Sequence, residues 1–494
     1  MLSFVSLGFL LFILAGAGVY YLLPGRFQWG WLLIVSWLYY LLAAGPRMIF
    51  FLLFSTVVTF LGGLFAERGG RAAVPVTLLL NFGMLAFLKY TNFLVLNLNA
   101  LFGTHLGIRA LLLPLGISFY TFQSAGYLLD VAWKRCRAER SFFRHALFVS
   151  FFPQIMQGPI GRFERLSGSL FSARSFDADR VRRGVLRILW GFFKKMLIAD
   201  YAAPYVSLIF DPASALQGYG LYGVLLYSAQ LYADFSGGID IVAGVAELFG
   251  ITLDENFRQP FFAVSITDFW HRWHITLGTW MKDYLFVPIS LSGWMGRFGK
   301  WCRRRLGKTV GRAMPVCVAN IIVFLVVGVW HGPAWHFIVY GLYNGLIIGI
   351  SGLLAKPYRS WKKALHINDR SSGFRLFQIV RTFLLVNISW FFDCSETVGQ
   401  AFRMMRESLR AAAFSVTCVN PGEPRQCMLH FGTMLAGCAV VFVVSVLRER
   451  GVDVRGAILQ KPAPARIAVV LLLLLVLGYF GCYDDFGGFI YANF

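Results

Sequence analysis

The sequence contains few charged residues and many apolar ones. Only 14% of its 494 residues are Asp, Glu, Lys or Arg, whereas typical soluble domains carry about a quarter. Hydrophobic residues make up 57% and aromatic residues 17%, more than one globular core could bury. Several apolar runs approach the roughly 20 residues that a helix needs to cross a bilayer. The composition excludes an ordinary soluble protein and predicts an all-α polytopic membrane protein.

Familiar enzyme and metal-site motifs are also absent. None of the 8 cysteines forms a C-x-x-C pair, which disfavours a zinc site. The lack of G-x-S-x-G, H-E-x-x-H and Walker-type motifs disfavours a serine hydrolase, a metalloprotease and an ATP-driven pump. We therefore expect no metal and no tightly bound cofactor. Without an internal repeat or a long linker, residues 1–494 should form a single membrane-embedded domain.

The excess of positive charge indicates membrane topology. Lys and Arg number 46 against 24 Asp and Glu, and they gather in short blocks between apolar runs. Such blocks are typical of cytoplasmic loops, so we expect no nucleic-acid partner. No Lys or Arg follows Arg466, and the tail 482–494 should therefore be extracytoplasmic. The first cationic block follows three apolar runs, which places the N-terminus outside too. The first run lacks a basic flank and is expected to be a retained span.

Apolar runs predict the positions of the helices. Lys89 interrupts the stretch from Val74 to Phe102 and leaves the number of crossings there open. The segment from Asp393 to Cys427 should be an external loop with a surface helix, Val398 to Ala413, carrying Phe402, Met405 and Leu409 on one face. Other predicted spans are Phe4–Leu23, Trp29–Ala43, Phe50–Phe65, Leu111–Leu129, Phe377–Phe392, Met428–Leu447 and Ile467–Gly481.

His331 is the clearest ionisable residue within an apolar span. It follows the run from Ile321 to Trp330, and Gly332-Pro333 breaks the helix directly after it. A broken helix at membrane depth is tolerated only beside protein or a water-filled cavity. An imidazole there suits proton transfer, or it could be a structural histidine bonded to a carbonyl. His336 is expected to be structural.

A second polar concentration runs from Asp234 to Ser292. Asp234, Asp240 and Glu247 lie in apolar helical surroundings, and their partners are expected among Arg258, Arg272 and Lys282. His274 follows Trp273 and could hold a substrate or make a structural hydrogen bond. An aromatic belt alone could explain Trp270, Trp273 and Trp280. In the external loop, Cys418 and Cys427 flank Asn420-Pro421-Gly422 and could form a disulfide, or remain two thiols.

Four motifs resemble the membrane-bound O-acyltransferase superfamily. They are FFPQIMQGPIGRFERL from Phe151, DFSGGIDIVAGVAELFGI from Asp234, DFWHRWHITLGTWMKDYLFVPIS from Asp268 and VWHGPAWHFIVYGLYNG from Val329. They occur in the family's order, and the similarity covers most of the chain. The length, the opening segment and the terminal FIYANF resemble the bacterial alginate O-acetyltransferase group more than the teichoic-acid D-alanyl transferases. The chain departs at Leu291–Gly293, which is LSG where many relatives have LGG.

The resemblance implies about eleven membrane helices, with short re-entrant helices, around a central tunnel. It also implies that an acyl group, acetyl being favoured, passes from a cytoplasmic thioester such as acetyl-CoA or an acyl-carrier-protein thioester to a cell-envelope polysaccharide. The family's catalytic histidine matches His331, and its second histidine matches His274. Residues near these motifs are expected to line the tunnel or bind substrate: Trp330, Trp273, Arg272, Asp268 and Asp234.

The C-terminus resembles the F-x-Y-x-x-F ending of this subgroup. Phe489, Tyr491 and Phe494 match it, and the resemblance implies that Tyr491 carries the acyl group in transit. It further implies location in the bacterial inner membrane and a separate extracytoplasmic transferase of the serine-esterase type. D-alanyl transfer to teichoic acid, a proton-coupled transporter or flippase and a non-catalytic scaffold are alternatives. Internal inverted repeats would favour a transporter, and the sequence has none.

Overall fold

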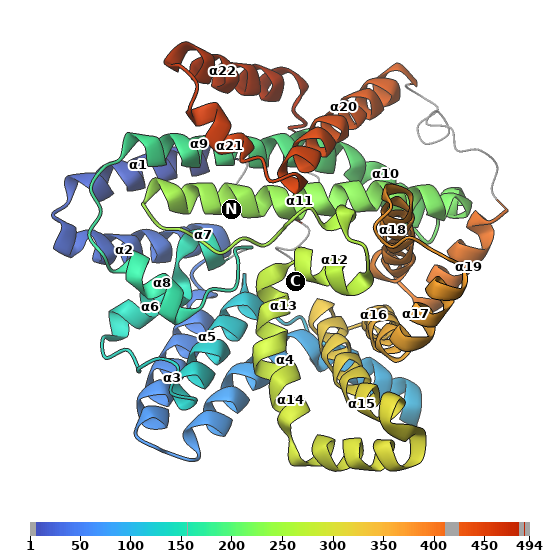
Figure 1. The fold of residues 1–494 in the computed structure, drawn as a ribbon. Coiled ribbons are helices and arrows are strands. Elements are labelled where there is room, and N and C mark those ends of the chain that lie inside the picture. The colour runs from blue at the N-terminus through green and yellow to red at the C-terminus, as the bar shows by residue number, and fades with distance from the viewer. Residues whose placement is uncertain (1–5, 156, 411–423, 484–488, 490–494) are drawn as a thin grey trace. The chain divides into compact units, whose positions relative to one another are not determined.

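The computed structural model describes residues 6–155, 157–410, 424–483 and 489, and the regular secondary-structure elements in these ranges are helices (Figure 1). The described residues form no β-strand, only an isolated antiparallel bridge between Phe257 and Trp273. The all-α prediction is confirmed. Two compact units are present, one formed by Met1–Asp200, Tyr232–Asp254 and Gly451–Phe494, the other by Tyr201–Leu231 and Glu255–Arg450. The single domain stays a prediction.

The first unit begins with the N-terminal helices and ends with the last two. Its helices are α1 (Leu7–Leu22), α2 (Gly25–Ala44), α3 (Ile49–Glu67), α4 (Ala73–Phe102), α5 (Ile117–Ala132), α6 (Phe142–Ser150), α7 (Phe152–Ile155), α8 (Phe163–Leu170), α9 (Ala178–Lys194), the π-helical turn η1 (Lys195–Ala199), α21 (Val454–Leu459) and α22 (Ala463–Phe480). Two further helices, α10 (Asp200–Phe210) and α11 (Gly220–Leu248), run through both units.

Close backbone contact holds α9 against the second half of α11, and the two helices run side by side in Figure 1. A Cβ atom on Gly191 would lie 2.6 Å from the carbonyl oxygen of Gly237, and one on Gly184 would lie 2.7 Å from that of Gly244. Only glycine permits this approach. Small residues at helix contacts are typical of membrane proteins, where close packing replaces the hydrophobic effect between helices.

The second unit contains the segments in which the sequence places both histidine motifs. Its elements are η2 (Ala215–Tyr219), η3 (Pro260–Phe262), α12 (Ile266–Arg272), α13 (Ile275–Met281), the π-helical turn η4 (Lys282–Phe286), α14 (Val287–Leu291), α15 (Gly293–His331), α16 (Trp335–Leu353), α17 (Ala355–Ala364), α18 (Ser372–Cys394), α19 (Val398–Ser408) and α20 (Pro424–Glu449). A break at Gly307, with φ of 77°, separates the basic first part of α15 from its apolar second part.

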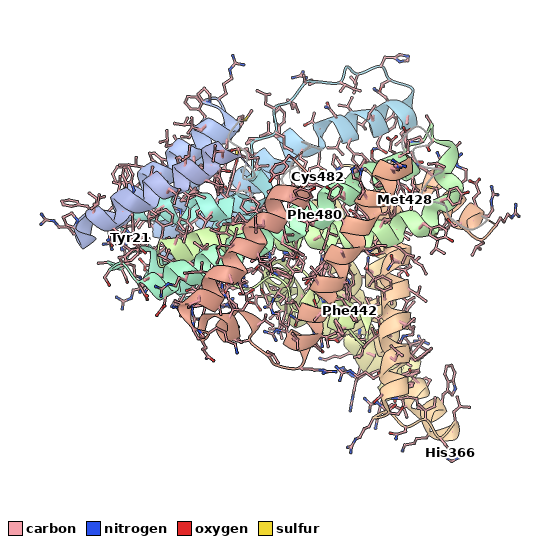
Figure 2. All side chains as sticks on the ribbon, turned by 90° about the horizontal axis from the view of Figure 1, so that it is seen from above. Tyr21, His366, Met428, Phe442, Phe480 and Cys482 are labelled. Carbon is pink, nitrogen blue, oxygen red and sulfur yellow. The ribbon has the colours of Figure 1, made fainter. Side chains whose placement is uncertain are left out.

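Eight helices within the described residues are long and apolar enough to cross a membrane, whereas the resemblance implies about eleven. They are α2, α3, α4, α15, α16, α18, α20 and α22. Large apolar side chains on them are exposed, as a lipid-facing surface requires. Figure 2 shows Met428 and Phe442 on α20, which are 65% and 61% exposed, and Phe480 at the end of α22. The polytopic prediction is confirmed.

Three predicted segments differ from the structure in detail. Helix α4 continues through Lys89, so the two apolar runs there form one helix of 30 residues. Helix α5 begins at Ile117 and not at Leu111, because Gly116 adopts a left-handed conformation with φ of 69° directly before it. The surface helix is present as α19, but it buries Ala401 and Met404 and leaves Phe402 exposed; residues 411–423 lie outside the described residues.

Candidate active site

His331 is the last residue of α15, at the point where Gly332-Pro333 ends the helix. A Cβ atom on residue 332 would lie 2.5 Å from the ring of Phe337, so a larger residue there would require this ring to move. The same hairpin is packed through Gly328 and Gly341, whose backbones meet closely. This arrangement holds His331 buried, with its ring 4.9 Å from that of Tyr340 between centroids.

His274 lies between α12 and α13 in an unusual backbone conformation. Its φ of 45° is in the left-handed region, which non-glycine residues adopt rarely and often at functional sites. Asn256 stabilises the turn, because its side-chain oxygen accepts hydrogen bonds from the backbone N–H and the hydroxyl of Thr276 at 3.0 and 2.7 Å. Nδ1 of His274 lies 3.3 Å from the same oxygen.

Trp330 joins the two histidines. Its ring lies 5.8 Å from that of His274 and 5.2 Å from that of His331 between centroids. Burial lowers the pKa of the His274 imidazole well below its usual range, and the neighbouring His331 lowers it further. His274 is therefore neutral at physiological pH. The structure thus brings His274 next to Trp330 and His331, which follow it in the sequence by 56 and 57 positions.

Two residues that the sequence analysis missed lie behind His331. Oδ1 of Asp393, at the end of α18, is 3.4 Å from Nδ1 of His331, and Oδ2 accepts a hydrogen bond from the hydroxyl of Tyr227 at 2.8 Å. The sequence analysis assigned Asp393 to the start of an external loop. The sequence signal that could have identified Asp393 is an acidic residue directly after an apolar run. A helix that continues past such a run buries this residue.

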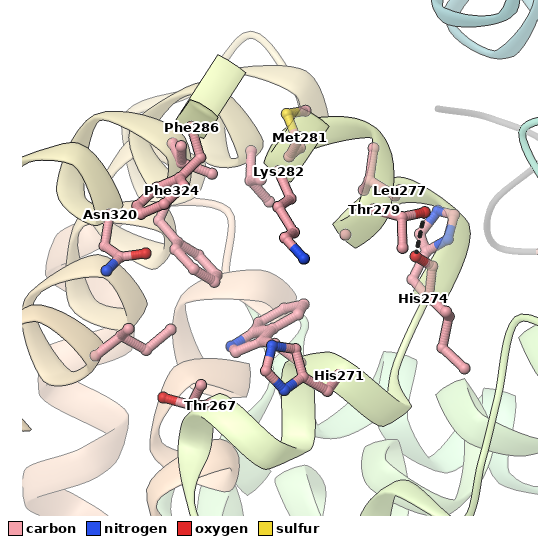
Figure 3. Close-up of a pocket in the computed structure, with 16 residues that line it drawn as sticks. Thr267, His271, His274, Leu277, Thr279, Met281, Lys282, Phe286, Asn320 and Phe324 are labelled. Carbon is pink, nitrogen blue, oxygen red and sulfur yellow. Dashed lines mark hydrogen bonds between the residues drawn. The ribbon is translucent and has the colours of Figure 1, made fainter. Parts of the chain in front are cut away.

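A cavity of about 350 Å³ lies beside His274, within the usual range of small-molecule sites (Figure 3). Figure 3 shows the side chains of Lys282 and His271 pointing into it. Val327, one turn before His331, and the rings of Trp270 and Phe324 form part of its apolar wall. Polar groups on the wall come from Thr267, His271, His274, Thr279, Lys282 and Asn320. The cavity therefore suits a mainly apolar group with a few polar atoms.

Comparisons with known proteins show the family of this chain. Residues 137–364, which include both histidines, match the model of the MBOAT, membrane-bound O-acyltransferase family. The chain is 32% identical to a probable alginate O-acetylase AlgI of Azotobacter vinelandii, over 90% of this chain and 85% of the relative. The chain belongs to the membrane-bound O-acyltransferase family. O-acyl transfer is accordingly its reaction class.

Relatives of this O-acyltransferase differ in their acceptors. A probable alginate O-acetylase AlgI of Pseudomonas aeruginosa is 34% identical over 83% of this chain and 75% of the relative. A peptidoglycan O-acetyltransferase of Helicobacter pylori is 31% identical, over 67% of this chain and 63% of the relative. A teichoic acid D-alanyltransferase of Bacillus subtilis is 32% identical, but over 50% of this chain and 61% of the relative.

The carboxylates of α11 have other partners than the sequence analysis expected. Asp234 pairs with Lys195 at 2.7 Å, Asp240 with Arg187 and Lys194, and Glu247 with Arg187 and Arg455. The prediction of Arg258, Arg272 or Lys282 was wrong. The cations of α9 face α11 because the two helices pack closely, and this helix pairing could not be read from the sequence.

Other predicted site residues of the O-acyltransferase lie around the histidines but not on the cavity wall as far as the structure describes it. Arg272 forms ion pairs with Asp268 at 2.9 Å and with Glu449 at 2.8 Å. Trp273 is buried between the rings of Phe257, Phe269 and Trp390 and is not part of a surface aromatic belt. Nδ1 of His336 lies 2.8 Å from the carbonyl oxygen of Phe392, as a structural role requires.

The C-terminal motif and the cysteine pair are described only in part. Phe489 is buried, with its ring 4.7 Å from Nζ of Lys195, whereas Tyr491 and Phe494 lie outside the described residues. Cys427 is buried against Tyr205, and Cys418 lies outside the described residues, so the disulfide stays a prediction. Within the described ranges, His, Cys, Asp and Glu side chains form no group of three or more that could hold a metal.

Proposed function

We propose that this O-acyltransferase moves an acetyl group from a cytoplasmic thioester across the bacterial inner membrane for O-acetylation of an envelope or extracellular polysaccharide. The donor is acetyl-CoA or an acetylated carrier protein. The observation that supports this proposal best is the pairing of His331 with His274 through Trp330, beside a cavity in the same unit. The relatives named as alginate O-acetylases, which match most of the chain, favour acetyl transfer to a polysaccharide.

The histidines have separate roles in the transfer step. His331 accepts the proton of the attacking hydroxyl as its oxygen bonds to the acyl carbon and the carbon–sulfur bond breaks. The thiolate leaves toward the cytoplasm and recovers the proton from the imidazolium. His274, buried with its Nδ1 directed at the side-chain oxygen of Asn256, positions the donor thioester beside His331. General-base help is typically worth about 10²–10⁴-fold in rate.

The cavity holds the arm of the donor that carries the thioester. A whole coenzyme A is a polyanion and cannot cross about 30 Å of hydrocarbon, so only its slender arm needs to reach the histidines. The apolar wall with Trp270 and Phe324 suits the arm's methylene groups, and Lys282 and His271 offer cationic or hydrogen-bonding groups. The π-helical turn that starts at Lys282 belongs to a class of irregular turns that is frequent at functional sites.

Tyr491 receives the acetyl group and passes it on outside the membrane. The absence of Lys and Arg after Arg466 supports an extracytoplasmic tail. A separate transferase of the serine-esterase type then acetylates the polymer. D-alanyl transfer to teichoic acid is the second candidate, supported by a relative of that name that matches half of this chain.

Labelling with radioactive acetyl-CoA tests the proposal. Purified full-length protein in lipid nanodiscs should transfer the label to Tyr491 or to added polysaccharide, and His331→Ala should lower the rate about 10²-fold or more. The matched control is His105→Ala, an exposed histidine, which should equal the wild type. Equal labelling of His331→Ala and wild type would contradict the role of His331. Transfer from D-alanyl carrier protein instead of acetyl-CoA would favour the second candidate.

A further inference from the structure

A buried carboxylate faces His331 from a different helix. Oδ1 of Asp393 lies 3.4 Å from Nδ1 of His331, and the two side chains are only 2% and 3% exposed. Among the residues that the structure describes, Asp393 has no ion pair with Lys or Arg. An ionised carboxylate in such surroundings is unfavourable unless hydrogen bonds and a positive charge compensate for the lost water. His331 is the group that can supply the charge.

Tyr227 fixes the carboxylate from the other side. Its hydroxyl donates a hydrogen bond to Oδ2 of Asp393 at 2.8 Å, and its ring packs edge-on against Trp390 at 5.9 Å. The two oxygens of Asp393 therefore have different neighbours, the tyrosine at Oδ2 and the imidazole at Oδ1. Since α11, α15 and α18 each contribute one member, the arrangement depends on the tertiary fold and not on a local motif.

We propose that Asp393, held by Tyr227, is the positioning residue for His331. This inference rests on the proposed function. With Nδ1 directed at Asp393, the ring takes the tautomer in which Nε2 accepts the proton of the attacking hydroxyl. Asp393 stays ionised and stabilises the imidazolium until the proton passes to the departing thiolate. The same division of roles makes a buried aspartate effective behind a catalytic histidine in serine hydrolases.

The contact between Asp393 and His331 is longer than a short hydrogen bond. At 3.4 Å the two atoms are at ion-pair distance but beyond the usual hydrogen-bond range. Proton transfer to His331 would shorten this contact, because the charge on the imidazolium then attracts the carboxylate directly.

Three other titratable side chains among the described residues face His331. His336 and Tyr340 face it from α16, and His274 faces it from the α12–α13 turn. The ring of His336 is directed at the carbonyl oxygen of Phe392, and His274 at Asn256. Among these described neighbours, Asp393 is the one with a carboxyl group. Its removal should therefore dominate any change in how His331 titrates.

The experiment measures His331 directly and separately from catalysis. Exchange of the C2 hydrogen of His331 for deuterium, followed by mass spectrometry over a range of pH, gives the pH at which this histidine gains its proton. Asp393→Asn keeps the shape of the side chain but removes its charge, so the midpoint should move to lower pH. Tyr227→Phe should move it in the same direction by less, because the carboxylate remains.

Kinetics with acetyl-CoA as the donor then test the role in transfer. Asp393→Asn should lower the rate constant about 10²-fold with little change in KM, and Tyr227→Phe should lower it about 10-fold. The control is Tyr343→Phe, which removes a buried hydroxyl that donates to the carbonyl oxygen of Leu385 at 2.9 Å. It accounts for any general effect of losing a buried tyrosine hydroxyl, and its rate should match the wild type.

The outcomes separate this inference from the proposed function. An unchanged midpoint for His331 in Asp393→Asn would overturn the pairing, whatever the activity. A shifted midpoint with an unchanged rate constant would overturn the role of Asp393 in transfer but leave the function standing. A wild type that transfers no acetyl group from acetyl-CoA or an acetylated carrier protein would overturn the proposed function, and with it the catalytic role of Asp393.

Discussion

Nζ of Lys195 lies 2.7 Å from Oδ1 of Asp234, and it also reaches Oδ1 of Asp200 at 2.8 Å. The side chains of Lys195 and Asp234 are 6% and 1% exposed. One ammonium group thus compensates two buried carboxylates at the π-helical turn between α9 and α10. Removing one member of a buried ion pair is strongly destabilising, because the remaining charge has neither water nor partner.

Lys195→Met should therefore lower the free energy of unfolding by about 3–5 kcal/mol. Asp234→Asn should lower the free energy of unfolding by less, because Lys195 keeps its ion pair with Asp200. The double variant should be more stable than Lys195→Met alone, because one of the two carboxylates that lost the Lys195 ammonium group has been neutralised. Thermal unfolding of the purified protein in one detergent, followed by intrinsic fluorescence, measures this order.

An exposed ion pair provides the control. Asp369, whose side chain is 55% exposed, contacts Lys362 at 2.6 Å, and Asp369→Asn should change stability by only about 0–1 kcal/mol. If Lys195→Met and Asp369→Asn had the same stability, the buried ion pairs would stabilise the protein no more than the exposed pair does.

The cavity beside His274 gives a second prediction. A Cβ atom on Gly278 would meet only the carbonyl oxygen of Trp270, at 3.5 Å, which is ordinary contact. Gly278→Ala should therefore retain activity, whereas Gly278→Phe should fill the cavity and raise KM for acetyl-CoA about 10-fold or more, since the donor arm loses its place. Initial rates at varied donor concentration measure both variants. Equal KM values would show that the donor binds elsewhere.

Much of the fold could be predicted from the local sequence, whereas the site could be predicted only in part. The break after His331 was predictable because Gly332-Pro333 cannot continue a helix. The span of α18 was predictable from its apolar run, but its last turn was not, so Asp393 was assigned to a loop. Periodicity gives the position of a helix along the chain and not its neighbours.

Long-range pairing accounts for the remaining errors. Tyr227 and Asp393 are 166 positions apart, and Lys195 and Asp234 are 39 apart. No spacing rule joins residues on helices that meet only in the folded protein. The three cations expected as partners of the α11 acids lie in the motifs that follow these acids in the sequence. The close approach of the glycines of α9 and α11 brings different cations into contact with them.

Topology is the third prediction. A phosphatase reporter fused after Phe494 should be active because it folds outside the cytoplasm, and a fluorescent reporter inserted beside Arg304 should fold inside. Arg304 is exposed in the basic first part of α15, before the break at Gly307, and cationic segments stay cytoplasmic. Reporter activities in living cells, normalised to protein amount, give the answer. An inactive phosphatase at the C-terminus would contradict the external tail and the carrier role of Tyr491.

The last prediction concerns Tyr491 itself. Phe489, two residues earlier, is buried with its ring 4.7 Å from Nζ of Lys195, which is a favourable cation–π distance. A phenol with a reference pKa near 10 forms an ester that is a better acyl donor than an alkyl ester. Tyr491→Phe removes only the hydroxyl oxygen, so it should leave thermal stability unchanged and abolish acetylation of the polysaccharide.

Peptide mass analysis after incubation with acetyl-CoA distinguishes a carrier from a residue that merely holds the tail. The wild type should show an acetyl adduct on Tyr491, and His331→Ala should lose it because the general base is missing. The matched control is Tyr483→Phe, also near the end of the chain, whose hydroxyl donates to the carbonyl oxygen of Leu477 at 3.0 Å. It should retain the adduct on Tyr491. Full acetylation of the polysaccharide by Tyr491→Phe would mean that the acetyl group passes directly from the thioester to the acceptor, without a tyrosyl ester.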